Sequence, residues 1–100
     1  MTIAPDSPLA TLWVPSPNQE ARVGGRVPDM LILHYTGMES AEAALDWLTR
    51  EESKVSCHYL IDEEGRIAQM VAEEARAWHA GQSLWAGETD LNSCSIGIEI

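Results

Sequence analysis

Apolar and polar positions along the chain predict several short strands and one helix. Residues 30–35, "MLILHY", are almost continuously apolar, which indicates a strand buried on both faces near the centre of a sheet. Residues 40–52, "SAEAALDWLTREE", carry apolar side chains at helical spacing with acidic residues opposite, so a helix is expected there. Thr36, in a T-x-x-E pattern, and Ser40 are both candidates for its N-cap. The apolar positions of this helix are Ala41, Ala44, Leu45 and Leu48.

The second half of the chain predicts a hairpin and a final strand. "VSCHYLID" and "RIAQMV" flank the turn Asp62–Gly65, where Gly65 is free to adopt a positive φ. A mostly irregular stretch follows, and residues 95–100, "SIGIEI", resume a strand. This order is typical of an α/β or α+β fold with a mixed central β-sheet flanked by helices.

The distribution of prolines suggests how the chain is organised. All five prolines lie in residues 1–28, which we interpret as an extended Pro-rich lead-in. Residues 29–100 are then the N-terminal part of a single domain. Because the sequence stops inside an apolar strand, either it is truncated at the C-terminus or its last strand is a sheet edge.

Charge and composition limit the kinds of partner that the protein can bind. With 16 acidic and 6 basic residues the formal charge is −10, which argues against nucleic acid and anionic membrane surfaces. The sequence contains neither a membrane-length apolar run nor a basic leader, so the expected location is the cytoplasm, with the periplasm or the exterior as alternatives. Cys57 and Cys94 form no CxxC pair and are expected to be small packed side chains. The oligomeric state is left open.

Two residues at strand ends are the main candidates for chemistry. His34 ends an apolar strand beside a glycine turn, where a rigid sheet can present a metal ligand; a structural hydrogen-bonded histidine is an equal alternative. Glu99 is the one charged residue of "SIGIEI". A carboxylate there is exposed, paired or directed into a site, and Gly97 on the same face leaves room for something to approach it. The alternative is a solvated glutamate on an edge strand.

The other histidines and one arginine are weaker candidates. His58 lies inside a hairpin strand, and a structural role is favoured. His79, in "AWHAG", suits either a ligand-contacting groove or a packed loop anchor. Arg76 precedes that motif and is a candidate local positive charge for an acidic ligand.

Four segments together resemble a known family. "ILHYTG", "VSCHYLIDEEGRIAQMV", "AWHAGQSLWAG" and "LNSCSIGIEI" are similar, in order and with similar gaps, to segments of the zinc-dependent N-acetylmuramoyl-L-alanine amidases of type 2. That family shares its fold with the amidase-type phage lysozymes and the peptidoglycan recognition proteins. The resemblance covers about residues 16–100.

The resemblance implies a role for each matching residue. His34 is implied to be a zinc ligand and Glu99 the catalytic acid/base, while Tyr35, Trp78 and His79 are implied to contact the substrate. No role is transferred to His58. The remaining zinc ligands of the family, a histidine and an aspartate, are expected after residue 100.

The implied function is zinc-dependent hydrolysis of the amide bond between N-acetylmuramoyl, or anhydro-muramoyl, and L-alanine. Peptidoglycan or soluble muropeptides would be the substrate, and the absence of a leader favours the soluble fragments. Two alternatives stay open: a non-catalytic peptidoglycan-binding module of the same fold, and an interaction domain with structural histidines.

Overall fold

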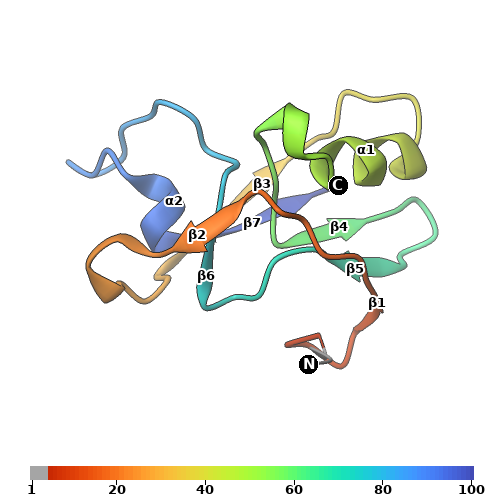
Figure 1. The fold of residues 1–100 in the computed structure, drawn as a ribbon, viewed down its shortest axis with the longest axis horizontal. Coiled ribbons are helices and arrows are strands. Elements are labelled where there is room, and N and C mark those ends of the chain that lie inside the picture. Colours follow the sequence, from red (N-terminus) through yellow and green to blue (C-terminus); the bar gives the residue numbers. More distant parts are fainter. Residues whose placement is uncertain (1–4) are drawn as a thin grey trace.

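The computed structural model describes residues 5–100, which fold around a five-stranded mixed sheet (Figure 1). The strand order is β1-β5-β4-β7-β3, with β4 and β5 antiparallel and the other neighbours parallel. The mixed α/β prediction is therefore confirmed. The strands of this sheet are β1 (Ala10–Trp13), β3 (Met30–His34), β4 (Tyr59–Ile61), β5 (Ile67–Gln69) and β7 (Ser95–Glu99). The remaining elements are β2 (Gln19–Ala21), β6 (Ala75–Ala77), α1 (Ala41–Leu48), α2 (Leu91–Cys94) and the 3₁₀ turns η1 (Val23–Gly25) and η2 (Glu51–Ser53).

The helix and the hairpin form where the pattern predicts them, but α1 ends at Leu48 and does not continue to residue 52. Ser40, one of the two candidate caps, is the N-cap of α1, and its hydroxyl accepts a hydrogen bond from the Ala43 amide at 3.0 Å. Gly65 turns the chain between β4 and β5 with φ +81°. The helix then packs on one face of the sheet. Its buried core consists of Ala44, Leu48, Cys57, Leu60, Met70, Val71 and Ala77.

One prediction about the sheet is wrong: β3 is an edge strand of the described sheet and not a central one. Its side chains alternate between half-buried and exposed, and Leu31 and Leu33 point away from the core. The continuous apolar run suggested burial on both faces, but only one face of β3 is covered by residues 5–100. An apolar run shows what a strand is able to bury and does not show its place in the sheet.

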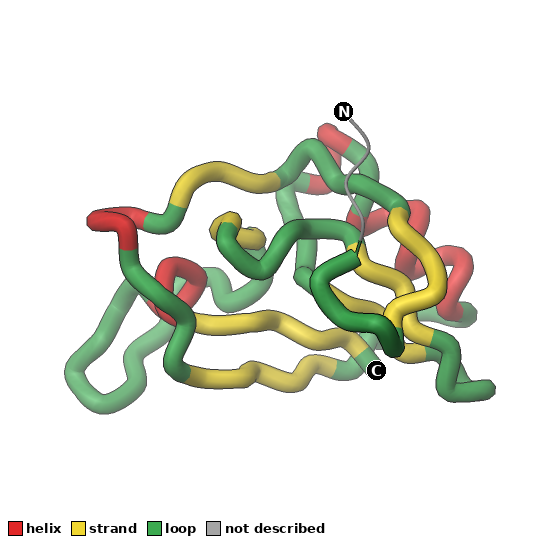
Figure 2. Tube along the Cα trace, turned by 90° about the horizontal axis from the view of Figure 1, so that it is seen from below, coloured by secondary structure: helices red, strands yellow, loops and turns green. Residues whose placement is uncertain are grey.

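The final strand, β7, occupies the central position that was expected for β3. β7 pairs in parallel with β3 on one side and β4 on the other, so the edge-strand alternative for "SIGIEI" is also wrong. Its two faces differ as the alternation predicts. Ile96 and Ile98 pack with Tyr59 on the face opposite α1, whereas Ser95, Gly97 and Glu99 share the face that carries the histidines. Figure 2 shows the helical segments toward the two ends of the molecule, with strands between them.

The predicted lead-in is extended, but two parts of it are strands. β1 pairs with β5 in the main sheet, and β2 pairs with β6 in a separate two-stranded sheet. Arg22, which is buried, donates hydrogen bonds to the carbonyl oxygens of Glu73, Asn92 and Ser95. Residues 1–4 of the lead-in lie outside the described residues, and the boundary at residue 28 stays a prediction. None of the helices in residues 5–100 has the length and apolar character that crossing a membrane requires.

Candidate active site

The parallel register of two strands brings the two principal candidates together. His34 is the last residue of β3 and Glu99 the last residue of β7, and they are direct partners across the ladder. The Ile100 amide continues the pairing by donating to the His34 carbonyl oxygen at 2.8 Å. Both side chains therefore leave the sheet at the carboxyl ends of adjacent parallel strands, which is where open α/β sheets bind ligands.

The side chain of Glu99 lines a hollow between α1 and the end of the sheet. We call it the Glu99 hollow. Burial raises the pKa of Glu99 above its ordinary value, because a charged carboxylate loses hydration there. A raised pKa suits a group that has to accept and return a proton. The hollow is lined by Thr36, Met38, Ala44, Trp47, Leu48, Val55, Ser56, Trp78, His79 and Glu99.

Two polar atoms of this hollow lack partners. Among residues 5–100, the buried side-chain polar atoms with no hydrogen-bond partner are Trp78 Nε1 and Glu99 Oε2, and both residues line the Glu99 hollow. Buried polar atoms are almost always paired, so orphaned ones need an explanation. One of these atoms is a donor and the other an acceptor, and both belong to side chains that line the same hollow. This arrangement is complementary to a ligand that offers both an acceptor and a proton.

His79 is held in place by several contacts. Its backbone amide and that of Ala80 both donate to Asn92 Oδ1, at 3.1 and 2.9 Å. Its ring Nε2 lies 3.0 Å from Ser95 Oγ, and its Nδ1 lies 3.0 Å from His34 Nε2. Burial, followed by the neighbouring His34, lowers the pKa of His79 to about 3, and burial also lowers the pKa of His34. The pair is therefore neutral near pH 7.

The sequence reasoning missed the roles of Ser95 and Asn92 in this arrangement. Ser95 was placed on the correct face of its strand, but nothing in "LNSCS" indicated a contact with a histidine 13 or 16 residues earlier. These contacts depend on how the irregular segment after β6 returns to the sheet. Local sequence patterns carry no such information.

The space above Gly97 is filled by the protein itself. A Cβ at Gly97 would lie 2.5 Å from Cγ of His79, a separation that real Cβ atoms do not adopt. The room that Gly97 was expected to leave for something to approach Glu99 is therefore occupied by the imidazole of His79. Glycine is required here for the packing of a ring against the strand.

His58 is a structural histidine, as the sequence reasoning favoured. Its side chain is completely buried, and its Nδ1 accepts a hydrogen bond from the Gly97 amide at 3.0 Å. Its Nε2 lies 2.9 Å from the Ala75 carbonyl oxygen and carries the proton, since Nδ1 is an acceptor. Both nitrogens are therefore satisfied by backbone groups, and His58 fixes Gly97 under the His79 ring.

Neither Tyr35 nor Arg76 lines the Glu99 hollow. The Tyr35 side chain is 84% exposed. Arg76 forms ion pairs with Glu20 and Asp90, each at 2.9 Å. Its charge is therefore neutralised within the protein.

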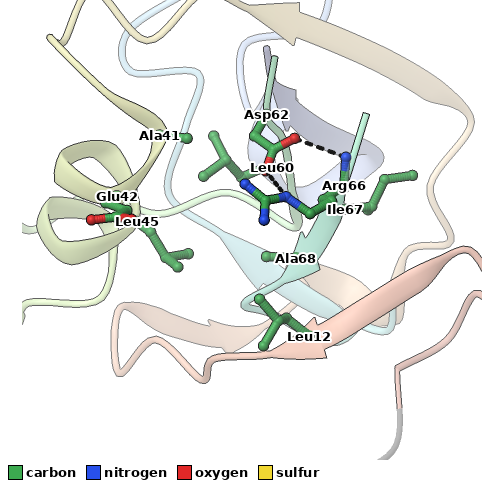
Figure 3. Close-up of a pocket in the computed structure, with 9 residues that line it drawn as sticks. All are labelled: Leu12, Ala41, Glu42, Leu45, Leu60, Asp62, Arg66, Ile67 and Ala68. Carbon is green, nitrogen blue, oxygen red and sulfur yellow. Dashed lines mark hydrogen bonds and ion pairs between the residues drawn. The ribbon is translucent and has the colours of Figure 1, made fainter. Parts of the chain in front are cut away.

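A second hollow lies between α1 and the β4–β5 hairpin (Figure 3). Its walls are mainly apolar, and its one ion pair joins Arg66 to Asp62 across the turn, with Nε and Oδ2 2.7 Å apart. This second hollow contains neither a histidine nor an unpartnered buried polar atom. The chemistry of the described chain is therefore concentrated in the Glu99 hollow. The second hollow is lined by Leu12, Ala41, Glu42, Leu45, Leu60, Asp62, Arg66, Ile67 and Ala68.

The donors of the site suit zinc but do not complete a zinc site. Neutral imidazole is a preferred zinc ligand, and Nδ1 of His34 has no hydrogen-bond partner among residues 5–100. However, this part of the chain contains no group of three His, Cys, Asp or Glu side chains placed to hold a metal ion. The described residues thus supply part of a donor set, of which His34 is the accessible member.

Comparison with known proteins gives a consistent result. The N-acetylmuramoyl-L-alanine amidase family model matches residues 24–100. The chain is 32% identical over 104 residues to the 1,6-anhydro-N-acetylmuramyl-L-alanine amidase AmpD of Escherichia coli, covering 87% of this chain and 57% of AmpD. It is 42% identical over 78 residues to the N-acetylmuramoyl-L-alanine amidase AmiD of the same organism, covering 71% of this chain and 27% of AmiD. The chain thus spans about a quarter to just over half of these relatives.

Solved structures agree with this fold. A crystal structure of an AmpD derivative superimposes with a TM-score of 0.77 at 30% identity, covering 99% of this chain and 65% of that one. AmiD of Escherichia coli, solved with the substrate anhydro-N-acetylmuramic acid-L-Ala-D-gamma-Glu-L-Lys, gives a TM-score of 0.62 at 41% identity. It covers 73% of this chain and 30% of that one. With three quarters of its residues matched by the family model and the same sheet in the solved relatives, the chain belongs to the N-acetylmuramoyl-L-alanine amidase family.

Proposed function

We propose that this chain carries the acid/base and one metal ligand of an amidase that releases L-alanyl peptides from muramoyl groups. The observation that carries the proposal is the Glu99 hollow, which is lined by Glu99 and Trp78, each with a buried side-chain polar atom that has no partner in residues 5–100, beside His34 at the end of the neighbouring strand. Relatives named for this activity share the fold.

The reaction is hydrolysis of an amide between a lactyl carbonyl and the amine of L-alanine. Glu99 accepts a proton from the attacking water as its oxygen bonds to the carbonyl carbon. It then returns the proton to the nitrogen as the carbon–nitrogen bond breaks, leaving a carboxylate and a free amine. Such proton transfer contributes roughly 10²–10⁴-fold in rate. The raised pKa of Glu99 supports both halves of this shuttle.

His34 is the proposed zinc ligand in this part of the chain. A bound zinc ion would polarise the carbonyl and lower the pKa of a water molecule to about 7. His34 suits this role because it is neutral near pH 7 and one of its nitrogens has no partner in the described chain. The expectation that a histidine and an aspartate after residue 100 complete the ligand set stays a prediction.

Substrate contacts in the proposal come mainly from Trp78. Its backbone is anchored by Ser56, whose hydroxyl accepts from the Trp78 amide at 3.0 Å. Its unpartnered Nε1 is then available to donate to an acceptor of the substrate. His79 adds the side of its ring to the wall of the hollow. Tyr35, exposed beside His34, is at most a peripheral contact.

The test is a comparison of variants of the full-length protein on muropeptides. Glu99→Gln should lower kcat by about 10²–10⁴-fold while zinc remains bound, whereas His34→Ala should lower zinc occupancy and activity together. Glu42→Gln is the matched control, because Glu42 is an exposed carboxylate on the rim of the second hollow. It should change neither quantity.

The result also separates the alternatives. Turnover that survives exhaustive chelation, with metal content measured as zero, would contradict the metalloenzyme proposal. Binding of muropeptide without release of peptide would indicate the non-catalytic module. Rates on anhydro-muropeptides and on intact murein compare the two substrate classes, and cell fractionation tests the predicted cytoplasmic location.

A further inference from the structure

His79 makes contacts that a residue serving only to bind substrate would not need. Its two ring nitrogens are both directed at protein atoms, with Nδ1 3.0 Å from His34 Nε2 and Nε2 3.0 Å from Ser95 Oγ. Ser95 is completely buried. These contacts leave neither nitrogen of His79 free to hydrogen-bond a substrate in the Glu99 hollow.

The scaffold around the ring is built to keep it there. Asn92 fixes the backbone on both sides of the ring by accepting from two consecutive amides. Gly97 provides a surface without a Cβ, and any side chain there would collide with the ring at 2.5 Å. Gly97 is in turn held by His58, which accepts from its amide at 3.0 Å and donates its own amide to the Gly97 carbonyl oxygen at 2.9 Å.

Each neutral imidazole carries one proton, and this limits the directions in which the hydrogen bonds among Ser95, His79 and His34 can run. If Ser95 donates to His79, then His79 donates to His34, and the remaining nitrogen of a neutral His34 must carry a proton. That arrangement leaves His34 with no lone pair for a metal. If His34 donates instead, the protons run from His34 to His79 to Ser95. Nδ1 of His34 then has a free lone pair, and it has no hydrogen-bond partner among residues 5–100.

We infer that His79 is a positioning residue for His34. It accepts a hydrogen bond from the Nε2–H of His34 and donates one from its own Nε2–H to Ser95 Oγ. This arrangement keeps the lone pair of His34 Nδ1 free to bind zinc. The inference rests on the proposed function for the role of zinc. Metal-binding histidines usually donate their second N–H to a fixed acceptor, and loss of that acceptor typically weakens metal affinity about 10–100-fold. A 3.0 Å contact is also shorter than the roughly 3.3 Å expected between two nitrogens that share a tetrahedral zinc ion.

The first measurement needs no metal. In metal-free full-length protein, the ¹⁵N shifts of the imidazoles report which nitrogen carries the proton. We expect His34 and His79 both to be protonated at Nε2. A wild-type His34 protonated at Nδ1 would overturn the inference.

The second measurement is zinc titration of four variants by calorimetry. His79→Ala should lower zinc affinity about 10–100-fold and leave His34 as a mixture of tautomers. His79→Asn places an amide oxygen near the former Nδ1 and should recover most of the affinity. Ser95→Ala should weaken affinity less, in the same direction. Its matched control is Ser93→Ala, since Ser93 is equally buried but bonds to Val23 and Arg76, and it should leave affinity and tautomer unchanged.

Other outcomes are equally informative. Unchanged affinity and tautomer in His79→Ala would overturn the positioning role. A loss equal to that of His34→Ala, without recovery in His79→Asn, would make His79 a direct ligand and also overturn it. If the wild-type protein bound no zinc, the proposed function would fail, whereas the tautomer of His34 would still decide the hydrogen-bond relay. Should His79→Ala not fold, the Asn and Ser95→Ala variants carry the test.

Discussion

His58 and His34 lie on the same side of the sheet and have opposite surroundings. His58 is completely buried, and backbone groups of β7 and β6 satisfy both of its nitrogens. His34 is half-buried at a strand end, and a side chain meets one of its nitrogens. A histidine whose two nitrogens are both satisfied by backbone groups is part of the framework. One with a nitrogen left over is available for chemistry.

Glu99 and Asp62 provide the same contrast between two carboxylates. Asp62, at the edge of the second hollow, is satisfied by Arg66 and by the backbone amides of Glu64 and Arg66. Glu99 has an oxygen with no partner in residues 5–100. The satisfied carboxylate closes a turn, whereas the unsatisfied one marks the place where a ligand is expected.

The largest expected difference is in stability. His58→Ala should lower the free energy of unfolding by about 3–5 kcal/mol, because it opens a cavity and leaves the Gly97 amide and the Ala75 carbonyl without partners. His34→Ala should change it by about 1 kcal/mol or less. Urea denaturation of the metal-free full-length protein measures both. Equal losses would show that the two histidines do not divide into framework and site.

Gly97→Ala should cost about 1–3 kcal/mol, since the new methyl group forces the His79 ring away from the strand. The displacement should also alter the tautomer of His34, because the ring is its acceptor. Denaturation and imidazole ¹⁵N shifts test the two effects together. A stable variant with an unchanged His34 signal would mean that the strand moves and the ring does not.

Lowering the pH should reduce the stability of the folded protein, because His58 is buried in its neutral form. Burial lowers the pKa of His58 below its ordinary value of 6.5, so the unfolded chain takes up a proton first as pH falls. The stabilisation is fully present above about pH 6.5 and is lost as pH falls toward the folded-state pKa, with a slope of up to about 1.4 kcal/mol per pH unit. His79 adds a loss of the same sign.

Denaturation midpoints measured from about pH 7.5 to 5 show this dependence, and His58→Gln should flatten it. The control is His34→Ala, which retains both His58 and His79. A wild-type midpoint that stays constant over this range would contradict the assignment of His58 as neutral in the folded protein.

The smallest expected effect concerns the orphaned indole. Trp78→Phe removes Nε1 but keeps an aromatic side chain, so it should raise KM for muropeptides by about 2–10-fold, the value of one neutral hydrogen bond. Stability should be unchanged or slightly higher, because a buried unpaired donor is lost. An unchanged KM would show that Nε1 makes no hydrogen bond to the substrate.

The sequence by itself determined the elements and the identity of the principal side chains. Apolar periodicity was sufficient for α1, for the β4–β5 hairpin and for the alternation that puts Ser95, Gly97 and Glu99 on one face, because these features depend on neighbours in the chain. It also identified His34 and Glu99 as polar residues at the ends of otherwise apolar strands. Their assigned roles came from the resemblance to the family.

Only the tertiary structure decided the order of the strands and the partners of each polar atom. β3 lies at the edge of the described sheet although its apolar run suggested a central position, and β7 lies inside it, where an edge position had been left open as an alternative. Strand order depends on long-range pairing that composition does not encode. The contacts of His79 with His34, Ser95 and Asn92 join segments up to 45 residues apart. Hydrogen bonding at such separations depends on where the folded backbone places each group, and that is why the relay beside His34 was not visible in the sequence.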